Sequence, residues 1–170
     1  MQHGEIGDAI ASVEDYFSTL QNPGPREDTT ATARIEQGLR CRIESPDGRA
    51  IYTDMPESVG GDNQCNSPGW HLRAALASCD ATLLAMRAAR VGIVLDSIEV
   101  RVEASSDGRG MFLDQGINPG SSAMQIHFRI GAGKASRDDV EALVRWVEEH
   151  SPVCADIARA VEVSSHLEIT

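Results

Sequence analysis

The sequence predicts an α+β fold, and its hydrophobic pattern is the basis for that prediction. Apolar residues alternate with polar ones in several short stretches, as in half-buried strands, and recur every three or four positions in others, as in amphipathic helices. The strands and helices come in blocks and not in alternating βα units. The 170 residues are enough for one domain with a buried core, and a hydrophobic content of 41% excludes a disordered chain.

Residues 1–27 are expected to form an N-terminal amphipathic helix and a linker, ahead of a single domain over residues 28–170. Apolar residues recur at helical spacing from Ile6 to Leu20, and acidic residues occupy the other faces. The stretch QNPGPRED at 21–28 interrupts this pattern with proline and glycine. We expect the helix to be a packing element or a dimer contact.

Residues 29–54 are expected to form strands, with a hairpin turn at the Pro-Asp-Gly sequence 46–48. In the stretch GLRCRIES, apolar residues alternate with charged ones. A period of two places Cys41 on the inward face and both Arg40 and Arg42 on the opposite face. The two arginines are interpreted as surface residues that could also reach a neighbouring subunit.

A long helix is expected from about Pro68 to Val91, after a polar loop that contains Cys65 as an accessible thiol without an assigned role. Alanines keep much of the helix surface small, and Cys79 lies in its main apolar stripe. Charged side chains are few, and one of them is Asp80. A helix with this pattern is buried over most of its circumference and allows another backbone to approach closely, so we expect it to be central.

The C-terminal half predicts two further strands, two helices and a closing strand. The strands are expected at 97–104 and 123–130, separated by a long glycine-rich loop. Ser136 is the expected N-cap of the next helix, which has acidic residues in its first turn. A short helix then follows in SPVCADIARA, and the alternating sequence VEVSSHLEI predicts the closing strand.

The formal net charge of −11 argues against nonspecific binding to nucleic acid or to an anionic membrane surface, since both require clustered lysine and arginine. The first residues lack the basic segment and long apolar core of a secretory signal, so we expect a cytoplasmic protein. Its four cysteines should therefore be reduced at rest. Cysteine and histidine spacings match no usual zinc pattern, and no metal or other cofactor is expected.

Two cysteines are candidates for chemistry. Ser151 is well placed as an N-cap with Pro152 at the first helical position, which puts Cys154 in the first helical turn. Free N–H groups and the helix dipole there should lower the pKa of Cys154. Cys79 lies more than two turns into its helix and would need an arginine or another polar group from elsewhere in the fold. From these residues alone, Cys79 is better interpreted as a packing residue, and packing and reactivity remain equally open for Cys154.

Three motifs together resemble the OsmC/Ohr family across about residues 30–170. These are the helix sequence SPGWHLRAALASCDAT, the Asp-Gly-Arg-Gly sequence at 107–110 after an alternating strand, and the late His-Ser-Pro-Val. The resemblance implies an OsmC-like domain that forms an intertwined homodimer, with antiparallel sheets wrapped around two central helices and active sites at the subunit interface. It also implies a cytoplasmic thiol peroxidase that reduces organic hydroperoxides.

The resemblance implies the following residue roles. Cys79 matches the peroxidatic cysteine, and Ser151 occupies the position of the resolving cysteine, so Cys154, one helical turn further on, is the possible replacement. Family enzymes also stabilise the thiolate with an arginine from the N-terminal strands, for which Arg40 and Arg42 are the candidates. Their helix begins with an N-P-E-Q pattern whose glutamate is replaced here by Gly69.

The leading functional prediction is a thiol-dependent peroxidase that uses an organic hydroperoxide as substrate. Either Cys154 or an external dithiol would reduce oxidised Cys79. The absent glutamate and the serine at the resolving position motivate a second hypothesis, a non-catalytic protein that binds a small apolar ligand in the dimer cleft. The third is a redox sensor or interaction protein that uses Cys154 or Cys65.

Overall fold

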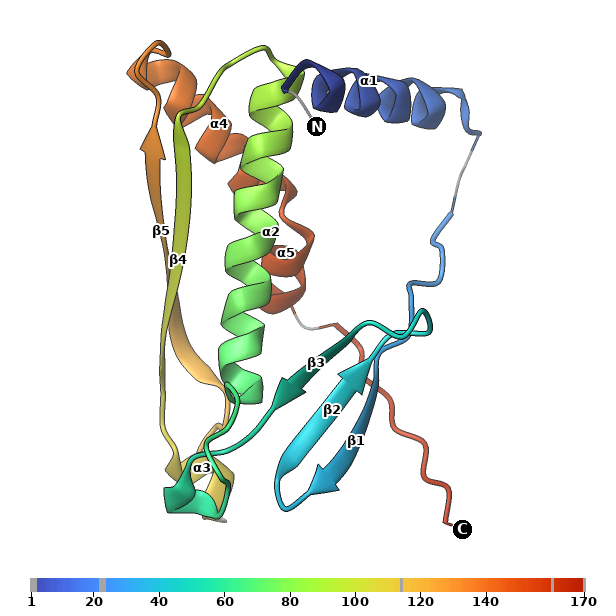
Figure 1. The fold of residues 1–170 in the computed structure, drawn as a ribbon, viewed down its shortest axis with the longest axis vertical. Helices are drawn as coiled ribbons and strands as arrows, with labels where there is room; N and C mark the ends of the chain where they lie inside the picture. Colours follow the sequence, from blue (N-terminus) through green and yellow to red (C-terminus); the bar gives the residue numbers. More distant parts are fainter. Residues whose placement is uncertain (1–2, 22–23, 114, 160, 170) are drawn as a thin grey trace. The chain divides into compact units, whose positions relative to one another are not determined.

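The computed structural model describes residues 3–21, 24–113, 115–159 and 161–169 (Figure 1). The chain divides into two compact units. The N-terminal unit holds Val13–Ala74, and the C-terminal unit joins the first twelve residues to the segment that begins at Ala75. Within the described part of the chain, no helix is both long and apolar enough to cross a membrane.

The N-terminal unit is built on an antiparallel sheet of three strands in the order β1-β2-β3. These are β1 (Thr32–Gln37), β2 (Arg40–Glu44) and β3 (Ala50–Thr53). Every residue of β2 is half-buried, and the side chains of Arg40 and Arg42 remain 39% exposed. β2 is the central strand, between β1 and β3, and the expected placement of Cys41 on the face opposite the two arginines stays a prediction.

A loop of the N-terminal unit is organised around the buried carboxylate of Asp54, which is only 2% exposed. Its Oδ1 accepts a hydrogen bond from the Met55 N–H at 2.7 Å, and its Oδ2 accepts one from the Gln64 N–H at 3.0 Å. These bonds lower the pKa of Asp54 below its ordinary value, the bond from Gln64 most, and the charge of Arg40 adds to them. The short 3-10 helix Glu57–Val59 lies between the two ends that Asp54 holds together.

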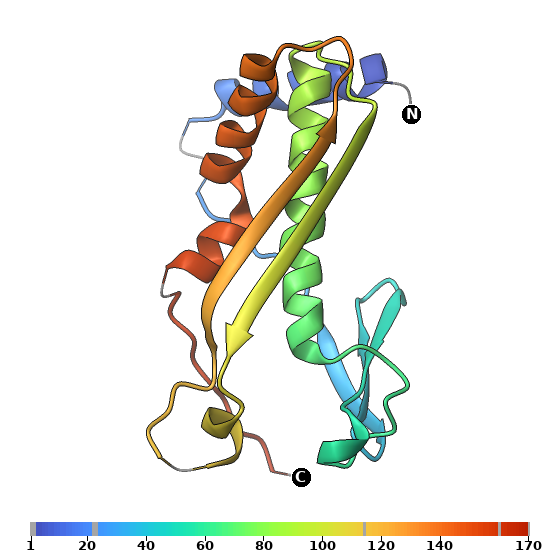
Figure 2. The same ribbon diagram turned by 90° about the vertical axis from the view of Figure 1, so that its left-hand side faces the viewer.

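The C-terminal unit packs helices on one face of a two-stranded antiparallel sheet (Figures 1 and 2). Its strands are β4 (Ser97–Ser106) and β5 (Ser121–Gly131), with the short helix α3 (Arg109–Phe112) between them. Burial alternates along both strands, so their apolar residues face the helices and their charged residues face outward. The two strands and the helix N-cap at Ser136 confirm the sequence pattern.

Two helices supply the centre of the core. They are α2 (Pro68–Arg90), which begins in the N-terminal unit, and α4 (Arg137–His150). The fully buried cluster consists of Leu84 and Ala88 from α2 with Leu143 and Val147 from α4. Partly buried residues of β4 and β5 pack against it, and the final helix α5 (Pro152–Ala158) follows α4 directly.

The first helix, α1 (His3–Thr19), docks on the end of α2 through its N-terminal residues. A methyl group added at Gly7 would lie 2.7 Å from the carbonyl oxygen of Ala89, which is closer than carbon and oxygen can pack. Glycine is therefore required at this contact, where the backbone of α1 lies against the backbone of α2. The expected packing role of the first helix is confirmed for this part of it.

The prediction of a closing strand over VEVSSHLEI is wrong, because residues 161–169 form no strand in the structure. Val163 and Leu167 are each 87% exposed, and Ile169 is 86% exposed. Alternation of apolar and polar residues creates two faces, but a strand also needs a neighbouring edge with which to exchange hydrogen bonds. The segment has no such neighbour in this structure of a single chain.

Candidate functional site

The candidate site lies in the C-terminal unit, where the middle of α2 meets the junction of α4 and α5. Consecutive residues of α2 face this junction differently, since helical neighbours are about 100° apart. The Cys79 side chain is half-buried, whereas Asp80 is only 2% exposed. Both cysteines of the site, Cys79 and Cys154, are free thiols.

Ser151 connects the elements of the site. It ends α4 and caps α5, with Pro152 at the first position of α5, as the sequence predicts. Its side chain is buried, and its Oγ accepts a hydrogen bond from the Cys154 N–H at 3.2 Å. The same hydroxyl donates to the Cys79 Sγ at 3.7 Å, so the residue at the expected resolving position contacts the candidate peroxidatic sulfur.

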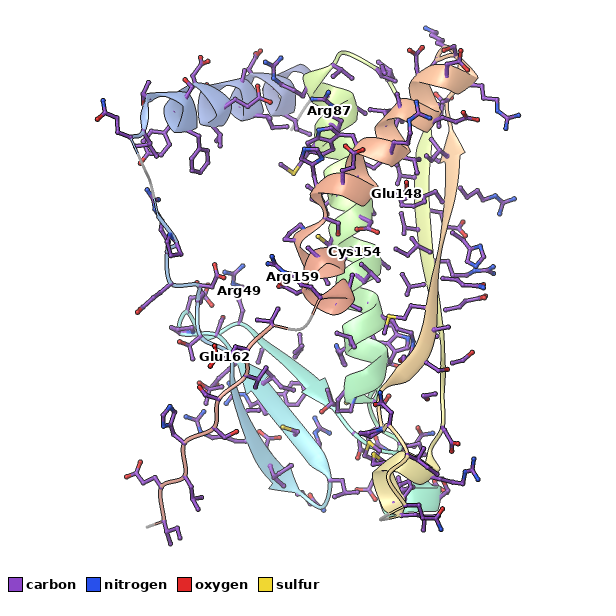
Figure 3. All side chains as sticks on the ribbon, turned by 180° about the vertical axis from the view of Figure 1, so that it is seen from behind. Arg49, Arg87, Glu148, Cys154, Arg159 and Glu162 are labelled. Carbon is purple, nitrogen blue, oxygen red and sulfur yellow. The ribbon has the colours of Figure 1, made fainter. Side chains whose placement is uncertain are left out.

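Cys154 lies on α5 where that helix runs alongside α2 (Figure 3). The expectation that its pKa is lowered is wrong. Burial raises the pKa of the Cys154 thiol, and the charges of Asp80, Cys79 and Glu148 raise it further. The Cys154 N–H already bonds the Ser151 hydroxyl, and the three groups that act on the sulfur are anions when ionised. Burial and the charges on α2 and α4 therefore raise the pKa of Cys154 more than its position in the first turn of α5 lowers it.

Asp80 is the residue of the site that the sequence analysis did not select. Burial raises its pKa, and a side-chain hydrogen bond with Ser151 partly opposes that shift. Its Oδ1 is buried without a hydrogen-bond partner among the described residues. The sequence signal that could have identified it is a single carboxylate in a helix of alanines and leucines, because an aspartate is almost never fully buried unless it is paired.

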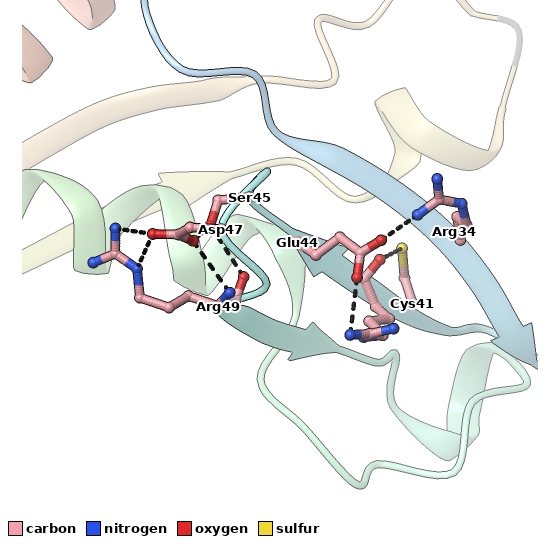
Figure 4. Close-up of polar contacts among 7 residues, drawn as sticks. Arg34, Cys41, Glu44, Ser45, Asp47 and Arg49 are labelled. Atoms are coloured by element: carbon pink, nitrogen blue, oxygen red, sulfur yellow. Dashed lines mark hydrogen bonds and ion pairs between the residues drawn. The ribbon is translucent and has the colours of Figure 1, made fainter.

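The two candidate arginines lie on β2 of the N-terminal unit, and their role as thiolate stabilisers stays a prediction. Arg42 pairs with Glu44 at 2.8 Å, and Figure 4 shows that Arg34 binds the same carboxylate. Arg40 lies 3.9 Å from Glu36 and stacks over the ring of Tyr52. In both arginines the Nε is buried and makes no hydrogen bond to the described residues.

The remaining residues singled out in the sequence are Cys41, Cys65 and Gly69. Cys41 is half-buried in β2, and its Sγ lies 3.9 Å from the carbonyl oxygen of Arg42. Cys65 is half-buried in its loop and so less accessible than expected. Gly69 is the second residue of α2, and a methyl group added there would lie at ordinary contact distance, 3.8 Å, from the Arg73 guanidinium.

One comparison with known proteins identifies a family. The family model described as OsmC-like protein matches residues 61–166, which include all four residues of the candidate site. No curated protein shows significant similarity to the chain.

Several solved structures share the fold. The chain is 22% identical to an organic hydroperoxide resistance protein OsmC from Legionella pneumophila, with 79% of this chain and 91% of that one covered and a TM-score of 0.59. It is 17% identical to an OsmC-like protein from Mycoplasma pneumoniae, with 79% and 88% covered and a TM-score of 0.62. It is 21% identical to the organic hydroperoxide resistance protein OhrB of Bacillus subtilis, with 76% and 89% covered and a TM-score of 0.51. These likenesses confirm the predicted fold class, while the intertwined dimer stays a prediction.

Proposed function

Because the chain belongs to the OsmC-like protein family, we propose that it is a thiol-dependent peroxidase that reduces organic hydroperoxides at Cys79. The observation that carries the proposal is the half-buried Cys79 sulfur held next to a hydroxyl donor, Ser151, within the segment that the family model matches. A hydrogen bond to a thiolate stabilises the anion that attacks peroxides. The names of the Legionella and Bacillus proteins support organic hydroperoxides as the substrate class.

The proposed reaction has two stages. The Cys79 thiolate attacks the terminal oxygen of the hydroperoxide, so that an S–O bond forms, the O–O bond breaks, and the alkoxide takes up a proton to leave as an alcohol. Sulfur is thereby oxidised to a sulfenic acid. The thiolate of Cys154 then attacks this sulfur, so that an S–S bond forms and the S–O bond breaks, and the hydroxide that leaves takes up a proton to become water. An external dithiol reduces the disulfide by thiol exchange.

The raised pKa of Cys154 bears on the second stage. Only the thiolate is an effective nucleophile, and burial together with neighbouring charges holds Cys154 in the thiol form. We therefore propose that direct reduction of the sulfenic acid by the external dithiol competes with formation of the disulfide. The two routes differ in their products, because only one leaves a covalent bond between α2 and α5.

The function is tested by turnover of cumene hydroperoxide with dithiothreitol as the external dithiol. We expect Cys79→Ser to abolish turnover and Cys65→Ser, a matched change of another half-buried cysteine, to leave it unchanged. Full turnover by Cys79→Ser would refute the proposal. After one equivalent of hydroperoxide, mass spectrometry should find the oxidation at Cys79, alone or bonded to Cys154.

An unmodified Cys79 in the same experiment would favour the non-catalytic alternative. Native mass spectrometry would then be expected to show a bound apolar molecule. Oxidation confined to Cys154 or Cys65, without turnover, would favour the redox sensor.

We also propose that the protein is a cytoplasmic homodimer. The family resemblance supports this assembly. Light scattering coupled to size-exclusion chromatography should give twice the mass of the 18.3 kDa chain.

A further inference from the structure

The Ser151 hydroxyl carries one proton but has two competing acceptors beside it. The structure shows it donating to the Cys79 Sγ at 3.7 Å, and the same side chain also acts on Asp80, whose pKa it lowers as a hydrogen-bond donor. A hydroxyl can donate once and accept twice. The Cys154 N–H fills one accepting position at 3.2 Å, which leaves one accepting position and the single proton for Asp80 and Cys79.

The protonation state of Asp80 decides how these two remaining bonds are arranged. A protonated carboxyl group donates to the Ser151 Oγ, so the hydroxyl proton is free to bind the Cys79 sulfur. An ionised carboxylate can only accept a hydrogen bond, so the Ser151 hydroxyl donates to it and no longer donates to the sulfur. When Asp80 is protonated, the hydroxyl makes all three of its bonds. When Asp80 is ionised, the third bond forms only while Cys79 is a thiol that can donate its S–H, because a thiolate can only accept.

We propose that Asp80 is a positioning residue that controls the reactivity of the Cys79 thiol through Ser151: protonated Asp80 directs the hydroxyl at the sulfur, and ionised Asp80 withdraws it. The proposal rests on the proposed peroxidase function, because it assigns Asp80 a role at the reacting sulfur. The hydrogen bonds that it involves are all made by residues of the C-terminal unit.

The surroundings of Asp80 support a protonated state that persists above ordinary carboxyl pKa values. The residue is 2% exposed, its Oδ1 has no partner among the described residues, and burial raises its pKa. Among the described carboxylates with a shifted pKa, Asp80 alone is held neither by a backbone N–H group nor by an arginine. A neutral carboxyl group tolerates such a place far better than a carboxylate does.

Other titratable groups also face this chain of residues. Cys154 comes from α5 and Glu148 from α4, and the charge of Glu148 acts on Cys154. On α2, Arg87 lies two turns beyond Asp80 and stacks on Trp146 of α4. The β4–β5 sheet contributes apolar residues to this side, because its charged residues are exposed on the outer face. Substitutions at Asp80 must therefore be compared with and without the Ser151 hydroxyl, to separate its action from a direct electrostatic effect.

The test is the rate at which iodoacetamide alkylates Cys79, followed on the Cys79 peptide by mass spectrometry from about pH 5 to about pH 9, which spans the usual thiol range. The proteins are the wild type, Asp80→Asn, Ser151→Ala and the double variant. Asparagine cannot ionise, and its N–H₂ group can donate to the Ser151 Oγ as the protonated carboxyl group does. We expect Asp80→Asn to raise the alkylation rate on the alkaline side and to remove a bend from the pH profile.

Ser151→Ala should lower the rate in the acidic to neutral range, by about tenfold if the hydroxyl makes a normal bond to the thiolate. In the Ser151→Ala background, Asp80→Asn should have no effect. An equal gain from Asp80→Asn with and without Ser151 would mean that Asp80 acts directly by its charge and would overturn the proposal. No change in either background would overturn it as well.

Two further variants keep the test clear of folding effects. Ser136→Ala removes the corresponding N-cap hydroxyl from α4 and should leave the profile of Cys79 unchanged. Ser151→Thr retains a hydroxyl and should restore the wild-type profile. Alkylation requires no peroxide. If the wild type fails to turn over hydroperoxide but the variants show the expected differences in alkylation rate, the proposed function is rejected and the role of Asp80 is retained.

Discussion

Asp54 and Asp80 each have only 2% of their surface exposed, yet their pKa values shift in opposite directions. Both oxygens of Asp54 accept backbone N–H groups, so the protein stabilises its charge. Asp80 keeps one oxygen without a partner among the described residues, so burial dominates and the charge is destabilised. Low exposure to water does not by itself determine whether the pKa of a carboxyl group rises or falls. The hydrogen-bond donors around the carboxylate also affect the direction of the shift.

The largest effect is expected at Asp54. Asp54→Asn replaces one accepting oxygen with an N–H₂ group that must face a backbone N–H, so a buried donor loses its partner. We expect the thermal midpoint to fall by several degrees. Asp62→Asn, an exposed aspartate in the same loop, is the matched control and should leave the midpoint unchanged. Equal midpoints for the two variants would contradict the anchoring role of Asp54.

The next largest effect is the loss of stability expected when either N-cap serine is replaced by alanine. Ser136→Ala at an exposed cap should cost about 1 kcal/mol of unfolding free energy. Ser151→Ala also removes the hydrogen-bond partner of the buried Asp80 and should cost about 2 kcal/mol. Urea denaturation measures both values. A smaller loss for Ser151→Ala than for Ser136→Ala would show that its buried contacts do not stabilise the fold.

Asp80→Asn should have a smaller effect, and of the opposite sign to Asp54→Asn. A neutral amide removes the cost of ionising a buried group, so at neutral pH we expect the variant to equal or slightly exceed the wild type in stability. Urea denaturation at neutral pH measures the difference. A marked loss of stability would indicate that Asp80 is ionised and that its charge is stabilised in the folded protein.

The smallest effect is the pH dependence of these differences. The folded pKa of Asp54 lies below its ordinary value of 3.8, so its stabilisation is fully present above 3.8 and is lost as the pH falls through the folded pKa. The folded pKa of Asp80 lies above 3.8, so stability is highest below 3.8 and declines as the pH rises through the folded pKa. The advantage of wild type over Asp54→Asn should therefore shrink in acid, and any advantage of Asp80→Asn should disappear there.

Features that depend on local sequence could be predicted, and features that depend on tertiary contacts could not. Periodicity is sufficient for the α+β class, the long central helix and the strands that became β4 and β5. Capping is also local, so Ser151 and Pro152 were correctly placed at the start of α5. The pKa of Cys154 could not be predicted, because it depends on burial in the folded protein and on the charge of Asp80, which comes from a helix distant in the sequence. The strand expected at 161–169 failed for a related reason, since pairing depends on a neighbour that the segment itself does not contain.

The contact between Gly7 and Ala89 has a practical consequence for shortened versions of the protein. The predicted domain boundary would suggest starting the polypeptide at residue 28, which removes the helix that rests on the last turn of α2. The carbonyl of Ala89 and the small side chains beside it would then meet solvent. N-terminal deletion is therefore expected to lower the melting temperature, although the deleted residues include none of the proposed catalytic groups.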